Sequence, residues 1–171
     1  LRFLRELVRE VREVTVGKAL LSCRLGVAEG AEEGLHIEEG VEAAKTLAEE
    51  GLDLIHVSHA GSPPAPLEQD SPFDPVLQLA KPVGKALSVP VIGVGGIVEP
   101  AQAEEALRGG YADLVAVGRG ILADPGWARK TAEGKVEQIV RCLQCEPRCY
   151  HHTDPKLCPT RNRLGIQPPG L

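Results

Sequence analysis

Four short apolar runs alternate with helical patterns along this chain, and this alternation limits the folds open to it. In each helical segment the apolar residues recur at three- and four-residue steps, which is the pattern of an amphipathic helix. Short apolar strands separated by such helices indicate a parallel sheet covered by helices. The expected strands are residues 18–25, 52–58, 89–94 and 114–117, and the expected helices are 1–14, 37–50, 76–87 (bent near Pro82), 100–108 and 127–133.

Two α/β architectures match this order, a doubly wound sheet and a (β/α)8 barrel. A complete barrel needs about 250 residues, whereas this chain has 171. Four βα units preceded by a helix are what half of a barrel would contribute. From about residue 140 onward, the alternation of apolar strands and helical patterns stops, and cysteines, prolines and basic residues become frequent. We therefore expect a half-barrel over residues 1–139 and a Cys-rich tail over 140–171.

Charge and composition exclude several classes of partner. The net charge of −5 argues against non-specific binding of nucleic acid. No apolar run approaches the roughly 20 residues needed to span a bilayer, and no secretory signal is visible. We expect a cytoplasmic protein with a small-molecule substrate, no nucleic-acid partner and no membrane partner. The sequence begins inside a helical pattern and has no methionine, so we also expect a fragment or a processed piece.

Glycines at two strand ends mark a candidate phosphate site. The third strand runs into Gly95 and Gly96, and the fourth into Gly118 and Arg119. Glycine lets an anion approach backbone N–H groups, and a following helix N-terminus adds partial positive charge. The planar fork of arginine can hold two phosphate oxygens at once. We predict one phosphate held between these ends; the simpler alternative is that the glycines only form tight turns and Arg119 is solvated.

Three further polar residues lie in or just after the first two strands. Arg24 sits near the carboxyl end of the first strand, where an unpaired charge facing an apolar layer would be costly. It either contacts a ligand or pairs internally with Glu29 or Asp53. His56 and His59 flank the second strand end; contact with a ligand is possible for each, but we favour ordinary, hydrogen-bonded strand-end histidines.

Four cysteines near the end of the chain form a candidate metal site. Cys142, Cys145, Cys149 and Cys158 have the spacing C-x2-C-x3-C-x8-C, and clustering of this kind in an intracellular α/β protein indicates metal rather than disulfides. Soft thiolates suit iron–sulfur clusters and zinc alike. We favour iron–sulfur, with zinc and free thiols as alternatives.

The other residues near these cysteines, and the fifth cysteine, carry less weight. His151 and His152 could replace a ligand, but surface histidines are the preferred interpretation. Cys23 is expected to be a buried strand residue, because free cysteine packs as a small hydrophobe.

One ordered set of segments carries a family resemblance: RFLRELVREVREVTVG, LLSCRLG, GLHIEEGVEAAKTLAEEGLDLIHVS, VPVIGVGGI and ADLVAVGRGILADPGWARK. In this order they resemble the second half of an old yellow enzyme barrel, from Leu1 to about Lys135. That family comprises the FMN-dependent NADH:flavin oxidoreductases. The cysteine spacing is similar to the segment that follows the barrel in the 2,4-dienoyl-CoA reductase and trimethylamine dehydrogenase branch, although its last interval is shorter than usual there.

The resemblance implies a fold, cofactors and an activity. The fold would be the second half of a (β/α)8 TIM barrel, and the activity a hydride transfer from NAD(P)H through FMN to an activated alkene or related acceptor. Gly95, Gly96, Gly118 and Arg119 would hold the FMN phosphate. Arg24 would lie against the flavin ring near N1 and the C2 carbonyl, where positive charge stabilises the anion formed on reduction.

The same resemblance implies a [4Fe–4S] cluster on the four tail cysteines and assigns no proton donor to this chain. In the family, the front half of the barrel supplies the groups that orient the substrate and donate the proton. We therefore leave the catalytic residues unassigned and expect the chain alone to be inactive.

A half-barrel also leaves two sheet edges and an apolar inner face exposed. We therefore expect association with a missing N-terminal half-barrel or with a second copy. The alternative function is a non-catalytic phosphate-binding half-barrel with a zinc-stabilised tail. Another phosphate-binding barrel, such as a dihydroorotate-dehydrogenase-like enzyme, would not explain the cysteine tail.

Overall fold

The computed structural model describes residues 1–145, 149 and 154–163, and the chain divides into two compact units. The first unit comprises Leu1–Gly96 and Glu105–Ala116, and the second comprises Ile97–Glu104 and Val117–Leu171. The chain therefore passes between the units three times, after Gly96, after Glu104 and after Ala116. No helix in the described ranges is long and apolar enough to cross a membrane.

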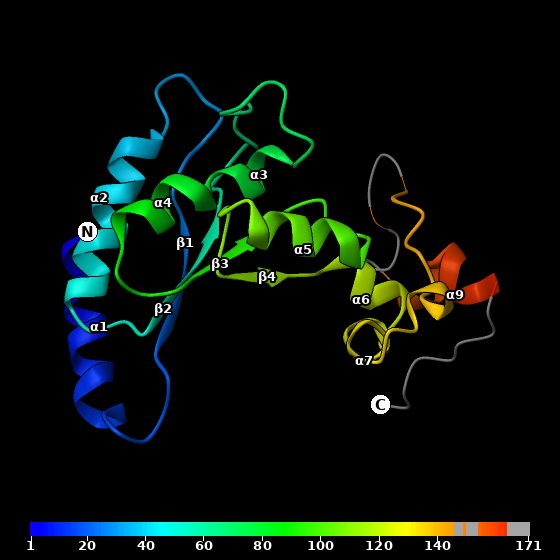
Figure 1. Cartoon of the computed structure of the whole chain (residues 1–171). Helices are drawn as coiled ribbons and strands as arrows, with labels where there is room; N and C mark the ends of the chain where they lie inside the picture. Colours follow the sequence, from blue (N-terminus) through cyan, green and yellow to red (C-terminus); the bar gives the residue numbers. More distant parts are fainter. Residues whose placement is uncertain (146–148, 150–153, 164–171) are drawn as a thin grey trace. The chain divides into compact units, whose positions relative to one another are not determined.

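A four-stranded parallel sheet organises the first unit (Figure 1). The strands follow sequence order, so that β1 and β4 form its edges within the described residues. All three pairings are parallel, which confirms the expected α/β architecture. The strands are β1 (Ser22–Gly26), β2 (Leu54–Ser58), β3 (Val91–Val94) and β4 (Leu114–Ala116).

Helices α2 and α4 cover one face of this sheet. Side chains of β2 and β3 pack against them, and the fully buried set includes Leu47, Ile55, Val83 and Val91. Because successive strand residues point to opposite faces, Ile55 and Val57 face the helices, and His56 between them faces the other way. The helices of this unit are α1 (Arg2–Thr15), α2 (Ile37–Glu49), α3 (Pro75–Gln78) and α4 (Ala80–Ala86), while α5 (Pro100–Arg108) begins in the second unit and ends in the first.

The single helix expected over residues 76–87 is instead two helices, divided at Leu79. Pro82 accounts for the division. A proline has no N–H to donate, and its ring crowds the carbonyl four residues earlier. That carbonyl belongs to Gln78, the residue at which α3 ends. The bend that we expected at Pro82 therefore occurs one helical turn before it.

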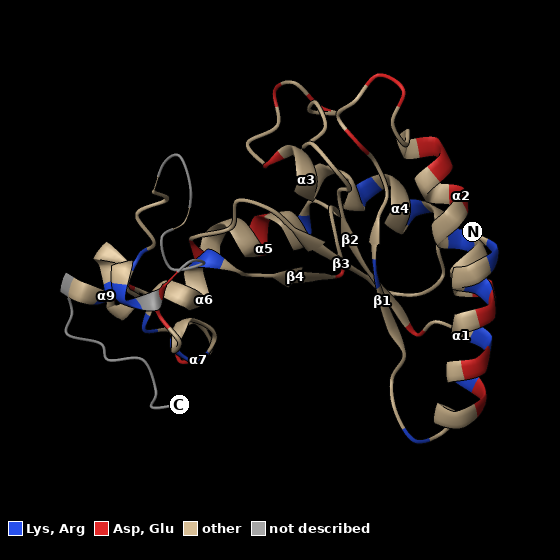
Figure 2. Ribbon diagram, turned by 180° about the vertical axis from the view of Figure 1, so that it is seen from behind, with Lys and Arg blue, Asp and Glu red and all other residues tan. Residues whose placement is uncertain are grey.

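Basic and acidic residues alternate along α1 (Figure 2). Three of its arginines hold the helix against the turn that follows α2. Arg5 and Arg9 both pair with Glu50, with an Arg5 nitrogen 2.7 Å from a carboxylate oxygen. Arg12 pairs with Asp53 at 2.6 Å and also donates to the carbonyl of Gly51. The expected helix over residues 1–14 is confirmed, and these charges fix where it packs.

The second unit consists of short helices. Helix α7 (Trp127–Ala132) corresponds to the expected helix 127–133, and the Trp127 indole donates to the carbonyl of Val98 at 2.9 Å. Two further helices were not expected from the sequence, because each is only five residues long and shows no repeating apolar pattern. They are α6 (Arg119–Ala123) and α9 (Pro159–Arg163).

Candidate functional site

Arg24, His56 and Ser58 lie on the sheet face that points away from α2 and α4. The register places Arg24 of β1 beside His56 of β2, and Ser58 lies two residues farther along the same face. The Arg24 guanidinium donates to the Ser58 hydroxyl at 3.0 Å. Arg24 is exposed, whereas Ser58 is buried. The strand pairing thus brings together an arginine and two polar neighbours on one face.

The internal ion pair considered for Arg24 with Asp53 does not form. Asp53 instead pairs with Arg12 and accepts the backbone N–H of Leu21 at 2.7 Å. The contact that the structure gives Arg24 is to a neutral hydroxyl. Ser58 was not identified as a site residue from the sequence. The available signal was its position two residues after His56, as the last residue of the strand expected over residues 52–58.

His56 is the titratable neighbour of Arg24 on this face. Its Nε2 atom is buried and has no hydrogen-bond partner among the described residues. Burial, and secondarily the charge of Arg24, lowers the pKa of His56 below its ordinary value of 6.5. At neutral pH the imidazole is therefore uncharged, and the ring keeps an unused polar atom. His59, by contrast, lies in the following loop with its Nδ1 3.4 Å from the Ala60 carbonyl oxygen.

Gly95 and Gly96 make the turn after β3, and internal packing alone requires glycine there. Both have positive φ angles, of 146° and 61°. A Cβ on Gly95 would lie 2.8 Å from a carboxylate oxygen of Asp74 and 2.9 Å from the backbone nitrogen of Leu77. Any side chain at Gly95 would therefore collide with the start of α3. This contact gives both glycines a structural role, whether or not a ligand binds.

Gly118 and Arg119 show the opposite situation. A Cβ on Gly118 would meet no described atom within 4 Å, and the residue has a negative φ of −87°. Nothing in the described packing requires a glycine here. Arg119 is exposed and makes no hydrogen bond or ion pair with another described residue. The second unit thus has bare backbone next to an available guanidinium.

Gly95 and Gly96 lie in the first unit, at the end of its stretch Leu1–Gly96, whereas Gly118 and Arg119 lie in the second, near the start of its stretch Val117–Leu171. Within the first unit, β3 and β4 are paired up to Val94 and Ala116. The carboxyl ends of β3 and β4 therefore lie side by side. In the sequence, β3 ends one residue before Gly95 and β4 ends two residues before Gly118. A shared phosphate site remains a prediction.

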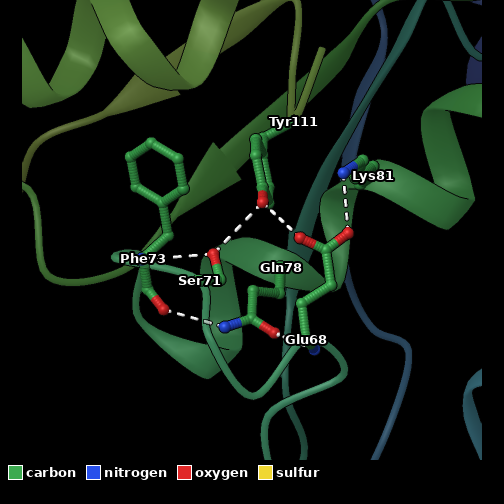
Figure 3. A network of polar contacts seen from close by, with 6 residues as sticks. All are labelled: Glu68, Ser71, Phe73, Gln78, Lys81 and Tyr111. Atoms are coloured by element: carbon green, nitrogen blue, oxygen red, sulfur yellow. Dashed lines mark hydrogen bonds and ion pairs between the residues drawn. The ribbon is translucent and has the colours of Figure 1, made fainter. Parts of the chain in front are cut away.

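A polar network fixes the loop between β2 and α3 (Figure 3). The Tyr111 hydroxyl lies 3.1 Å from the Ser71 hydroxyl and donates to Glu68. Lys81 pairs with Glu68 at 2.6 Å and lies 4.3 Å from the centre of the Tyr111 ring. Lys81 and then Tyr111 lower the pKa of Glu68. The loop is therefore tied both to α4, through Lys81, and to the segment between α5 and β4, through Tyr111.

Gln78 completes this network from within α3. Its side chain is 2% exposed, accepts the backbone N–H of Glu68 and donates to the carbonyl of Phe73, each at 2.8 Å. The loop leads directly into Asp74, whose side chain caps α3 by accepting from Val76. The network therefore sets the position of the carboxylate that contacts Gly95. Sequence analysis missed it because its members are separated by up to 43 residues.

The four tail cysteines are free thiols in the described residues, with Cys158 buried and the other three half-buried. The backbone N–H of Gln144 donates to the sulfur of Cys142 at 3.4 Å, and Gln144 has a positive φ of 49°. Hydrogen bonds to sulfur are a normal feature of cysteine-ligated clusters, so the chemistry of this donor set fits a thiolate-bound metal.

The described cysteine side chains do not come together as a metal-binding group, however. Among the described residues, no three His, Cys, Asp or Glu side chains are grouped closely enough to hold a metal ion. His151 and His152 lie outside the described residues. Cys23 is half-buried in β1, and burial raises the pKa of its thiol, as expected for a packing residue.

Asp124 anchors the chain just before the first tail cysteine. It is 4% exposed, pairs with Lys130 at 2.6 Å and accepts the backbone N–H groups of Gly126 and Val140, each at 2.9 Å. Burial alone would raise its pKa, but Lys130 and the two N–H donors outweigh burial and lower it. Asp124 thus fixes the backbone two residues before Cys142.

The comparisons with known proteins identify the family and support the fold. Residues 1–138 match the model of the NADH:flavin oxidoreductase / NADH oxidase family. The chain is 40% identical over 154 residues to NADH oxidase of Thermoanaerobacter brockii, covering 87% of this chain and 23% of that protein. The chain spans between about a fifth and two fifths of the length of the curated relatives that it matches first.

Solved structures give the same fold. The complex of 2-naphthoyl-CoA reductase with 2-naphthoyl-CoA superposes with a TM-score of 0.75 at 29% identity, covering 88% of this chain and 24% of the other. The old yellow enzyme homologue from Zymomonas mobilis superposes with a TM-score of 0.55 at 20% identity, covering 81% and 39%, and supports the fold alone. The expected partial (β/α)8 barrel is confirmed. Since the family model matches most of its length, the chain belongs to the NADH:flavin oxidoreductase / NADH oxidase family.

Proposed function

We propose that this chain supplies the phosphate-binding half of an FMN-dependent oxidoreductase that passes hydride from NAD(P)H to an activated alkene or related acceptor. The family supports FMN and a nicotinamide co-substrate. The observation that carries the site assignment is the open space at Gly118, where a Cβ would meet no described atom within 4 Å. The adjacent Arg119 is exposed and has no hydrogen-bond or ion-pair partner among the described residues. FMN, when bound, supplies hydride and single-electron transfer that no amino-acid side chain provides.

The residues of the chain have separate roles in this proposal. The backbone at Gly118 and the fork of Arg119 bind the phosphate, because a guanidinium can hold two phosphate oxygens. Gly95 and Gly96 form the turn that follows β3, where packing against Asp74 and Leu77 already requires glycine. Arg24 presents its remaining N–H groups to the pyrimidine edge of the ring system. The conjugated ring of 2-naphthoyl-CoA, named for the solved relative, is consistent with an unsaturated acceptor.

We further propose that Cys142, Cys145, Cys149 and Cys158 hold a [4Fe–4S] cluster. Support comes from the all-thiol donor set, the N–H···S bond at Cys142 and the anchoring of the preceding backbone by Asp124. Zinc on the same thiols is the alternative, and would go with a non-catalytic phosphate-binding role. Either metal needs reduced thiols, which agrees with the cytoplasmic location expected from the sequence.

Titration of FMN with the purified chain tests the phosphate site, with flavin fluorescence as the signal. The change Gly118→Ala should weaken FMN binding at least tenfold without lowering thermal stability, because its Cβ meets no described atom. Arg119→Ala should weaken binding by about tenfold, the effect of losing charge-assisted hydrogen bonds. Arg119→Lys should fall in between, since it keeps the charge but not the fork.

Gly84→Ala is the matched control, because its Cβ makes only an ordinary contact with Val91 at 3.9 Å. It should leave FMN affinity unchanged. The proposal is overturned if the native chain binds no FMN, or if Gly118→Ala and Arg119→Ala both bind as tightly as the native chain. If inorganic phosphate displaces FMN at equal concentration, the site recognises phosphate alone, which contradicts the flavin assignment.

Metal analysis of anaerobically purified chain tests the cluster. We expect iron and acid-labile sulfide in equal amounts, with a broad visible absorbance that is lost in Cys145→Ser. Zinc without iron contradicts the cluster and favours the alternative function. Because the flavin titration does not depend on the tail cysteines, the two assignments succeed or fail separately.

A further inference from the structure

We infer that Ser58 is the positioning residue for Arg24: its hydroxyl holds the guanidinium in the orientation in which the remaining N–H groups face the flavin. This inference rests on the proposed function, since it concerns how one residue of that site is directed. Ser58 would not itself touch the flavin. Its effect would be exerted through Arg24, so removing Ser58 should matter only while Arg24 is present.

The first step in the argument is the placement of the two side chains. The paired strands align Arg24 with His56 and Gly26 with Ser58. Because side chains alternate between the two faces along each strand, Arg24 and Ser58 lie on the same face of the sheet. Ser58 lies two residues beyond His56, the residue that is paired with Arg24. The 3.0 Å bond from the Arg24 Nη2 atom to the Ser58 Oγ atom therefore runs diagonally between neighbouring strands. It draws the arginine toward the carboxyl end of β2, the end from which the loop at His59 begins.

The second step is the contrast in burial between donor and acceptor. Ser58 is 7% exposed and is fixed within the sheet, where its own carbonyl accepts the N–H of Val27 at 3.0 Å. Arg24 is exposed, and a long charged side chain at the surface ordinarily samples many rotamers. A rigid acceptor at one edge of the guanidinium removes much of this freedom. It uses one of five N–H donors and leaves the others available.

The third step concerns His56, which is next to Arg24 in the register. Its buried Nε2 has no partner among the described residues, and its ring is neutral at pH 7 because burial and the nearby Arg24 charge lower its pKa. A neutral imidazole does not repel the guanidinium that Ser58 holds beside it. The Ser58 hydroxyl therefore orients the Arg24 guanidinium, and the neighbouring His56 ring adds no charge that would repel it. The positive charge of Arg24 remains available to the ligand.

The loss of this orientation in Ser58→Ala should change two measured quantities, the affinity for FMN and the midpoint potential of the bound flavin. Ser58→Ala leaves the arginine in place but frees it, and losing a hydrogen bond to a charged group corresponds to about a tenfold change in binding. The midpoint potential of the bound flavin should also fall, because a displaced positive charge stabilises the reduced ring less. A purely structural role for Ser58 would lower stability without moving this potential.

A double-mutant cycle on the full chain tests the inference, with the FMN dissociation constant and the midpoint potential of bound FMN as readouts. Ser58→Ala should weaken FMN binding about tenfold in the native background and less than about twofold in the Arg24→Ala background. Ser58→Thr, which keeps the hydroxyl, should restore most of the affinity. Ser22→Ala, an exposed serine on the same face of β1, should have no effect.

Two results would overturn the inference. One is an equal loss of affinity from Ser58→Ala in both backgrounds, which would mean that Ser58 acts independently of Arg24. The other is an unchanged affinity and potential in Ser58→Ala. If the native chain binds no FMN at all, the proposed function fails first, and this outcome differs from a chain that binds FMN but is insensitive to Ser58.

Discussion

Glycine occupies different positions in this chain for different physical reasons. Gly40 of α2 faces the end of β1 so closely that a Cβ there would lie 1.9 Å from the carbonyl oxygen of Val27. Gly84 of α4 has ordinary clearance, with its nearest neighbour at 3.9 Å, and Gly118 has no described neighbour within 4 Å. Glycine is thus required by helix packing at Gly40 and is dispensable at Gly84, while no described packing requires it at Gly118.

Alanine substitutions at the two helix glycines should have opposite effects. Gly40→Ala should lower the free energy of unfolding by about 1–3 kcal/mol or more, because helix and strand must move apart to admit the methyl group. Gly84→Ala should raise it by about 0.4–1 kcal/mol, since it restricts the unfolded chain without a clash. Urea unfolding followed by circular dichroism measures both. Equal effects of the two substitutions would contradict the close approach of α2 to β1.

Candidate site residues could be selected from the sequence by their type and position, but the residues that they contact could not be identified. Arg24, Gly118 and Arg119 could be selected because a charge or a bare backbone at a strand end has few explanations. Ser58 could not, because its significance depends on pairing with a residue 34 positions earlier. Likewise, the structural requirement for Gly95 becomes visible only when Asp74 is placed against it.

At the scale of elements, charge pairs hold α1 in place. Its buried contacts are few, with Val8 as the one residue of the helix that is fully buried. Its arginines instead reach Glu50 and Asp53 beyond the end of α2. Arg9, followed by Arg5, lowers the pKa of Glu50 from 4.5 to about 2. The docking of α1 therefore depends on pH and on salt.

Acidification should weaken this docking in a defined window. Because the pKa of Glu50 is lower in the folded state, its stabilisation is fully present above about pH 4.5 and is lost as the pH falls toward 2. Glu50→Gln removes that stabilisation at every pH, so its unfolding free energy should depend less on pH across this window. Urea unfolding at several pH values measures the slope.

Glu49→Gln is the matched control, since Glu49 is the exposed neighbour of Glu50. It should retain the native dependence on pH. A slope that is the same for Glu50→Gln and for the native chain would show that the arginine pairs do not hold α1.

Element boundaries were predicted less well than element types. Periodicity identified the four strands and the longer helices, because burial against one layer imposes it. The first three strands begin two to four residues later than expected, β4 ends one residue earlier, and the helix containing Pro82 is divided at Leu79. A proline acts on a carbonyl one turn away, so the position of the break follows from helix geometry and not from the local sequence. The short helices α6 and α9 contain too few residues to show a period.

At the scale of the whole chain, unpaired edges are the main consequence of a partial barrel. Strands β1 and β4 each have one neighbour within the described residues. Leu114 of β4 is 48% exposed, and the outer side of α1 exposes Phe3 to 76%. Unpaired strand edges and exposed apolar side chains favour association. We therefore propose that a complementary half-barrel, or a second copy of the chain, covers these surfaces.

Light scattering after size-exclusion chromatography tests this association. We expect a mass above that of the 18.2 kDa monomer for the chain alone, and a defined complex when a polypeptide with four complementary βα units is co-expressed. Leu114→Lys should shift the equilibrium toward monomer, because a charge opposes burial of the edge. A stable monomer at all concentrations that gains no partner on co-expression would contradict the proposal.

The three passages of the chain between its two units limit how such a protein can be divided. Because residues 97–104 belong to one unit and 105–116 to the other, no single cut in the backbone separates the two units, since every cut leaves residues of both units on one of the fragments. Deleting everything after Gly96 would also remove β4 from the sheet. Limited proteolysis at one site would therefore not release the two units as separate, complete fragments.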